Sequence, residues 1–216
     1  NQEDLLLKSL LDDSTENISF GKANANITGQ IIELTPYINM CWQSSSYRSK
    51  NINTSMVGNY NFYNFLAAIS IGNYFGVKEI DISDAVATYK PENKRSQVLE
   101  TQKNTLIIDC YNANPTSMLV ALESFRDFRN NKKLAIIGDM LELGEESDLE
   151  HQKIIDYCKE HKIEFMTVGP IFNKHNKDRA YKNVEGISSE LNMVNATTIL
   201  LKGSRGIELE KLITLL

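Results

Sequence analysis

From residue 105 onward, short apolar runs alternate with segments of helical periodicity, and this alternation constrains the fold more than any other feature. We expect four buried strands, at Thr105–Cys110, Leu134–Gly138, Phe165–Val168 and Thr197–Leu201. Helical patterns separate or follow them, at Pro115–Phe128, Asp148–Glu160 and Gly206–Leu216. The polar segment Asn173–Lys182 is expected to be a surface loop or a frayed helix. Strands that are apolar along their whole length are typical of a parallel sheet with helices on its faces. The sequence therefore predicts an α/β fold with a mostly parallel sheet.

The chain before residue 91 has a different pattern of apolar and turn-forming residues. Its β-like runs are separated by Asn, Gly, Pro and Ser, which predicts an antiparallel meander of strands at Asn17–Phe20, Ile27–Leu34, Tyr37–Trp42 and Ile52–Val57. Helices are expected at Glu3–Leu11, Phe62–Phe75 and Ser83–Tyr89, the last with Ser83 as its N-cap. The segment Pro91-Glu92-Asn93-Lys94 is polar and holds a helix breaker. We therefore place a domain boundary between residues 93 and 94.

Composition excludes several classes of function. The 216 residues carry a formal net charge of −5 and no Lys/Arg stripe that would follow a phosphate backbone, so we expect no nucleic-acid partner. No apolar run approaches the roughly 20 residues of a membrane span. The cysteines and histidines show no zinc-site spacing, so we expect no metal site. The three histidines, His151, His161 and His175, are expected to be surface residues.

Three of the expected strands end in polar residues, at Asp109–Pro115, Gly138–Glu145 and Lys202–Gly206. In an open α/β sheet, ligands bind outside the carboxyl ends of the strands. A carboxylate such as Asp109 accepts hydrogen bonds from sugar hydroxyls or holds a cation, and two cations beside a helix N-terminus bind anions. The structural alternative is that Asp109 and Asn114 only cap turns and a helix. By spacing alone, the Gly138–Glu145 segment is better explained as a solvated acidic loop.

Two asparagines, Asn61 and Asn64, are three residues apart at the start of a predicted helix, so they share one face. Each amide offers a donor and an acceptor, and together they would read the edge of a nucleotide base. Considered without any other motif, this pair is better explained as a helix-capping residue and a polar surface residue.

Taken in order, these segments resemble the Mur ligase family. Gly58-x-Tyr60-Asn61-x-x-Asn64-x-x-Ala67-Ala68 resembles a family pattern, and Arg95 matches the family's arginine after the interdomain linker. The segments Asp109–Met118, Gly138–Gly144 and Lys202–Arg205 are similar to the signatures of the branch that adds D-alanyl-D-alanine. The resemblance covers nearly the whole chain.

The resemblance implies a domain organisation and a reaction. Residues 1–93 would be the C-terminal part of the family's central ATP-binding domain, and residues 94–216 its Rossmann-like C-terminal domain. The activity implied is that of a cytoplasmic ADP-forming ligase of peptidoglycan precursor synthesis, with ATP and Mg²⁺ as cofactors. It would join D-alanyl-D-alanine to UDP-N-acetylmuramoyl-tripeptide. ATP would phosphorylate the peptide carboxylate to give an acyl phosphate and ADP, and the dipeptide amine would then attack the acyl phosphate to give the amide and phosphate.

The resemblance also assigns roles to residues. Asn61 and Asn64 would contact the nucleotide near its adenine, Asp109 would meet the ribose, and Arg95 would face the phosphates. Arg95 and Asp109 are thereby the candidate catalytic residues. The side where the two peptides meet would be lined by Asn112, Asn114, Lys202, Ser204 and Arg205.

This sequence departs from the family pattern in two respects. The phosphate loop, the magnesium-binding acid and histidine and the modified lysine of the family are absent. We expect them before residue 1, in a longer protein, and expect this chain alone to be inactive. Tyr60 stands where the family usually has histidine. The alternative is a non-catalytic α/β module that binds a ligand or partner. The third residue of the peptide and the oligomeric state are not specified.

Overall fold

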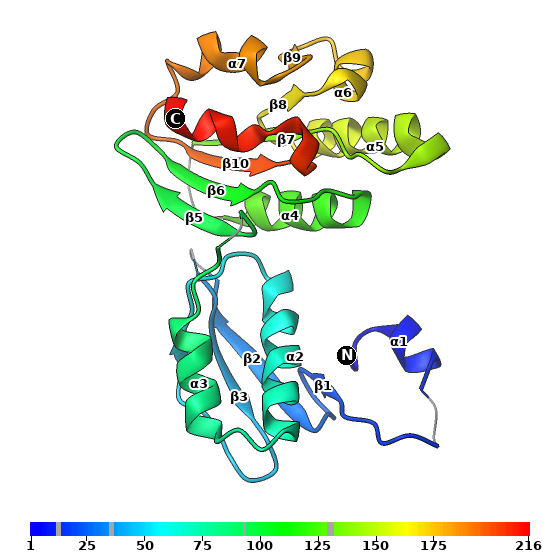
Figure 1. Ribbon diagram of the computed structural model, residues 1–216, viewed down its shortest axis with the longest axis vertical. Helices are drawn as coiled ribbons and strands as arrows, with labels where there is room; N and C mark the ends of the chain where they lie inside the picture. The colour runs from blue at the N-terminus through cyan, green and yellow to red at the C-terminus, as the bar shows by residue number, and fades with distance from the viewer. Residues whose placement is uncertain (12–13, 35–36, 93, 129–131) are drawn as a thin grey trace. The chain divides into compact units, whose positions relative to one another are not determined.

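The computed structural model describes residues 1–11, 14–34, 37–92, 94–128 and 132–216. They form two compact units, Asn1–Lys90 and Pro91–Leu216 (Figure 1). Asn93, the last residue of the predicted first domain, lies outside the described residues, and the boundary between residues 93 and 94 stays a prediction. Within the described ranges, no helix combines the length and apolarity needed to cross a lipid bilayer.

The second unit is built on a sheet whose six strands, among the residues described, run in the order β5-β6-β10-β7-β8-β9. The strands are Gln97–Glu100 (β5), Thr105–Asp109 (β6), Lys133–Gly138 (β7), Phe165–Val168 (β8), Ala180–Tyr181 (β9) and Thr198–Lys202 (β10). Every neighbouring pair is parallel except β5 and β6, which are antiparallel. The predicted α/β class with a mostly parallel sheet is confirmed.

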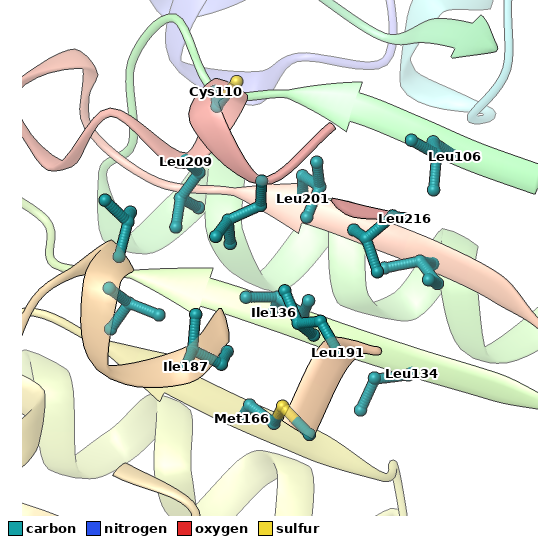
Figure 2. Packing of buried hydrophobic residues seen from close by; sticks show 14 of the residues in the cluster. Leu106, Cys110, Leu134, Ile136, Met166, Ile187, Leu191, Leu201, Leu209 and Leu216 are labelled. Carbon is teal, nitrogen blue, oxygen red and sulfur yellow. The ribbon is translucent and has the colours of Figure 1, made fainter. Parts of the chain in front are cut away.

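Helices cover both faces of this sheet (Figure 1). One face carries Pro115–Asp127 (α4), Ser147–Glu160 (α5) and Pro170–His175 (α6), with the short 3₁₀ turn Gly144–Glu146 (η1) before α5. The other face carries Val184–Leu191 (α7) and the 3₁₀ segment Leu209–Leu215 (η3). Alternate residues of the central strands, such as Leu106, Ile136 and Leu201, point into this second layer and pack against leucines and isoleucines of α7 and η3 (Figure 2).

Two predictions for the second unit are wrong in detail. The closing helix is two 3₁₀ segments, Arg205–Ile207 (η2) and η3, because Glu208 between them has the left-handed φ of 59°. The predicted loop Asn173–Lys182 contains the end of α6 and the edge strand β9. That strand has only two residues and depends on its pairing with β8, so it has no apolar run of its own.

The first unit has a four-stranded sheet within the described residues, in the order β1-β2-β3-β4, together with three helices. The strands are Phe20–Gly21 (β1), Ile27–Glu33 (β2), Asn39–Gln43 (β3) and Ile52–Asn53 (β4), and the helices are Leu5–Ser9 (α1), Tyr60–Tyr74 (α2) and Glu79–Thr88 (α3). Strands β2 to β4 form the predicted antiparallel meander, whereas β1 pairs with β2 in parallel. Apolar residues of β2, β3 and α2 share one core.

Ser83 is not the N-cap that the sequence predicts. Helix α3 begins at Glu79, and Ser83 lies inside it and is buried. Its hydroxyl donates to the carbonyl of Glu79 and accepts the indole N–H of Trp42, each at 3.0 Å. Ser83 therefore joins the helix to strand β3.

Candidate functional site

The carboxyl ends of β6, β10 and β7 lie side by side, so the three polar strand ends found in the sequence meet at one edge of the sheet. Lys202 at the end of β10 is in register with Asp109 of β6 on one side and with Ile137 of β7 on the other. Strands β6 and β7 are consecutive in the parallel part of the sheet but lie on opposite sides of β10. Such a change of strand order opens the crevice in which α/β proteins bind ligands.

Asp109 and Lys202 form a buried ion pair. The Lys202 Nζ lies 2.7 Å from Asp109 Oδ2, and the two side chains are 2% and 16% exposed, respectively. The other carboxylate oxygen of Asp109 accepts the backbone N–H of Ser96 at 3.3 Å. A lysine this buried needs an anionic partner, so the pair fixes the carboxylate at the mouth of the crevice. The sequence predicts both residues as ligand-binding groups but not their contact.

Arg95 lies against the loop that follows β6. Its guanidinium carbon is 3.9 Å from the centre of the Tyr111 ring, which is a cation–π contact, and both side chains are exposed. The neighbouring Lys94 is held from two directions, since its carbonyl accepts the N–H of Cys110 and its ammonium pairs with Glu210 at 2.6 Å. The structure thus brings Arg95 to the strand end that carries Asp109.

The two asparagines after β6 differ in their contacts. Asn114 is the N-cap of α4, because its side chain accepts the N–H of Ser117 at 2.8 Å while the Ser117 hydroxyl accepts the N–H of Asn114 at 3.1 Å. Asn114 therefore caps the helix, and its role in binding a peptide stays a prediction. Asn112 accepts only the N–H of the adjoining Ala113 among the side-chain bonds described, and it is exposed.

Ser204 is buried and tied to the loop after β7. Its N–H donates to the carbonyl of Asp139 at 3.1 Å, and its hydroxyl oxygen accepts the N–H of Leu141 at 2.9 Å. The ends of β7 and β10 approach closely here, since a Cβ on Gly203 would lie 2.9 Å from the Cα of Gly138. Only glycine allows this approach. Arg205, the next residue, is exposed.

Asp139 is a buried structural carboxylate. Its two oxygens accept the N–H groups of Ile171 and Phe172, each at 2.8 Å, so it caps the start of α6. Burial raises the pKa of Asp139 above its usual value, and these N–H groups oppose the shift by favouring the carboxylate. The interpretation of this segment as a solvated loop is wrong for Asp139, although Glu142 and Glu145 are exposed.

His151 is fully buried, so its prediction as a surface residue is wrong. His161 is exposed, as predicted, and His175 is partly buried beside Asp148. The sequence holds a signal for the burial of His151. Ile154, Ile155 and Cys158 follow it at helical spacing, and all three are buried.

The first unit carries the predicted amide pair. Asn61 is buried, where its Nδ2 donates to the carbonyl of Val57 at 2.8 Å and its Oδ1 accepts the Nδ2 of Asn64 at 2.9 Å. Asn64 is exposed. The two side chains share one face of α2, and Asn61 orients Asn64.

The described residues offer no ready site for a metal ion. Across the described ranges, no group of three or more His, Cys, Asp or Glu side chains could hold one. The side chains of Asp109, Asp139 and His151 are instead bound to Lys202 or to backbone N–H groups. These residues therefore do not fit a complete magnesium site.

Comparison with known proteins identifies the family. The profile described as "Mur ligase, glutamate ligase domain" matches residues 94–205, which is more than half of the chain. This chain belongs to the Mur ligase family. Within that family it is similar to the UDP-N-acetylmuramoyl-tripeptide–D-alanyl-D-alanine ligases of Bacillus subtilis (31% identity, covering 73% of this chain and 38% of the relative) and Rickettsia prowazekii (31%, 65% and 36%). The chain thus spans less than two fifths of the length of these curated relatives.

Solved Mur ligase structures show the same fold. The UDP-N-acetylmuramoylalanyl-D-glutamyl-2,6-diaminopimelate–D-alanyl-D-alanyl ligase of Acinetobacter baumannii is 26% identical, with a TM-score of 0.79 over 91% of this chain and 45% of that one. A MurF ligase from Thermotoga maritima, solved in complex with ADP, is 19% identical with a TM-score of 0.80 over 99% and 51%. A Mur ligase fold is therefore shared along most of the chain.

Proposed function

We propose that this Mur ligase chain contributes to a cytoplasmic, ATP-dependent ligase of peptidoglycan precursor synthesis. The ligase would join D-alanyl-D-alanine to UDP-N-acetylmuramoyl-tripeptide and release ADP and phosphate. The observation that carries the proposal is the meeting of three signature segments at the carboxyl edge of β6, β10 and β7. The ligases named above as relatives support this choice of substrates.

Asp109 and Arg95 are proposed to bind ATP. The Asp109 carboxylate is fixed by Lys202 and Ser96 but is still 16% exposed, and it has lone pairs left for ribose hydroxyls. The Arg95 guanidinium is held on an exposed aromatic face, a weak contact that it can exchange for phosphate oxygens. In the first unit, the exposed amide of Asn64 would meet the adenine, with Asn61 holding it in place.

The peptide side is proposed to comprise Asn112, Asn114, Ser204 and Arg205, with Lys202 beneath them. Arg205 and Asn112 are exposed and suit direct contact with carboxylate and amide groups. Lys202 is buried against Asp109, so we assign it an indirect role through that carboxylate. Asn114 acts by starting α4 at a fixed place below the loop.

These groups would accelerate the reaction by position and charge. Acyl transfer through a phosphate needs the carboxylate, the phosphoryl group and the amine held in contact, and it needs donors for the negative charge that develops. Arg95, beside the end of β6, and Arg205, after the end of β10, would supply cationic donors at the same edge of the sheet. ATP would supply the phosphoryl group.

The proposal is tested by the substrate dependence of ADP release from the full-length gene product. We expect ADP to form only when ATP, the muramoyl tripeptide and D-alanyl-D-alanine are all present, with one amide formed per ADP. ADP release that ignores the dipeptide would contradict the proposed reaction. Binding of a ligand without any turnover would favour a non-catalytic module.

A further inference from the structure

The buried imidazole of His151 holds the loop to which Ser204 is bound. His151 lies on α5 and has no exposed surface. Its Nδ1 is 2.7 Å from the carbonyl oxygen of Ser147, so Nδ1 carries the proton and donates. Its Nε2 accepts the N–H of Met140 at 3.0 Å. The partners thus define one neutral tautomer.

The loop that receives this contact is bonded to Ser204 on both sides of Met140. The Asp139 carbonyl accepts the N–H of Ser204, and the Leu141 N–H donates to the Ser204 hydroxyl oxygen. Three successive residues of the loop therefore make one bond to His151 and two bonds to Ser204. A shift of Met140 would therefore change the position and orientation of the Ser204 hydroxyl.

The surroundings keep the ring in a single orientation. Phe172 packs edge-on against it with the ring centres 4.5 Å apart, and the Asp139 carboxylate lies 3.8 Å from Nε2. Burial lowers the pKa of His151, which favours the neutral imidazole. Only the neutral form leaves Nε2 free to accept the Met140 N–H.

We propose that His151 is a positioning residue that aims the Ser204 hydroxyl at the incoming dipeptide. The inference rests on the proposed function, in which Ser204 lines the peptide side of the crevice. Because Ser204 Oγ already accepts the Leu141 N–H, its own proton is available for an acceptor on the substrate. His151 would act on the affinity for D-alanyl-D-alanine through the loop, without touching the substrate.

Two substitutions of the full-length protein separate positioning from simple core packing. In His151→Gln, the amide oxygen reaches the place of Nε2 and still accepts the Met140 N–H. In His151→Asn, the shorter side chain places its amide near the position of Nδ1. It can keep the bond to the Ser147 carbonyl but loses the bond to the Met140 N–H. Each variant loses one hydrogen bond from the same buried site, so we expect similar losses of thermal stability. The exposed His161, the C-cap residue of α5, supplies the matched control, His161→Asn.

We expect the KM for D-alanyl-D-alanine to rise about tenfold in His151→Asn and to stay within about twofold in His151→Gln and His161→Asn. Ser204→Ala should raise the same KM about tenfold, and adding His151→Asn to it should have no further effect. Equal KM changes in the Gln and Asn variants, or independent effects in the double variant, would overturn the inference.

Amide hydrogen exchange gives a readout that needs no turnover. The Leu141 N–H should exchange faster in His151→Asn than in His151→Gln, because its bond to Ser204 is loosened only in the first. Equal exchange in the two variants would overturn the inference even if ligation is observed. Absence of ligation by the wild-type protein would instead count against the proposed function.

Discussion

At the residue scale, the Asp109–Lys202 pair is the central electrostatic feature of the crevice. The lysine is almost completely buried, whereas the carboxylate keeps some contact with solvent. Removing the carboxylate would leave a buried charge without its partner, and removing the lysine would free the carboxylate to move. The pair therefore couples the stability of the second unit to the geometry of its proposed nucleotide site.

Replacing Lys202 by Met should destabilise the second unit by about 2–3 kcal/mol. This is less than the roughly 3–5 kcal/mol for breaking a fully buried pair, because Asp109 is partly solvated. The free energy of unfolding, measured by denaturant titration, checks the value. Lys211→Met, which breaks an exposed pair with Glu208, should change the free energy of unfolding much less. Equal losses in the two variants would show that Lys202 is not bound as described.

The contact between Arg95 and Tyr111 predicts a difference between two substitutions of the tyrosine. Tyr111→Leu removes the aromatic face that Arg95 must leave in order to bind phosphate, so it should lower the KM for ATP of the full-length ligase by about two- to fivefold, since an exposed cation–π contact is worth about 0.5–1 kcal/mol. Tyr111→Phe keeps the face and should change the KM little. If the Phe variant changes the KM as much as the Leu variant, the ring does not act by holding Arg95.

His151 predicts a pH dependence of stability. Burial lowers its pKa in the folded protein below the usual value of 6.5, so the unfolded chain binds the proton more readily. Stability contributed by this group is complete above about pH 6.5 and falls as the pH decreases through that value. Thermal unfolding at about pH 7.5 and about pH 5.5 should show a smaller loss on acidification in His151→Gln than in the wild type. A loss of equal size in both would contradict the assignment.

At the scale of elements, the sequence predicts those strands and helices that carry their own signal. Strands β6, β7, β8 and β10 are apolar runs that can only be buried, and their order along the chain gave the α/β class. Strand β9 and the start of α6 carry no such pattern. They exist because β8 offers an open edge and because Asp139 accepts the first N–H groups of α6. Such partners are distant in sequence, so periodicity does not reveal them.

The junction between β8 and α6 predicts an unusually costly glycine substitution. Gly169 has a φ of +129°, and a Cβ there would lie 2.3 Å from the carboxyl carbon of Asp139. Gly169→Ala should therefore destabilise the protein by about 3 kcal/mol or more through strain and displacement of the carboxylate. Gly144→Ala, at a φ of +57° with open space around it, should cost only about 1–2 kcal/mol. Thermal unfolding compares the two, and equal losses would contradict the packing at Asp139.

At the scale of the whole molecule, the sequence predicts which residues gather at the site better than how they are paired. The three strand-end segments were found from their polar residues, and the sheet order places them together. The ion pair of Asp109 with Lys202 and the bonds of Ser204 to the β7 loop depend on β10 lying between β6 and β7. That order comes from a long crossover, which no local pattern encodes.

The proposed nucleotide contacts of the second unit are Asp109 and Arg95, which lie at the same strand end. The proposed ligase requires that ATP meets both residues, and this requirement is the central claim for the molecule.

A crystal structure of the full-length protein with bound ADP tests that claim most directly. We expect a ribose hydroxyl within about 3 Å of the Asp109 carboxylate and the Arg95 guanidinium turned from Tyr111 to the phosphates. ADP whose ribose lies away from Asp109, with the Arg95–Tyr111 contact unchanged, would contradict it.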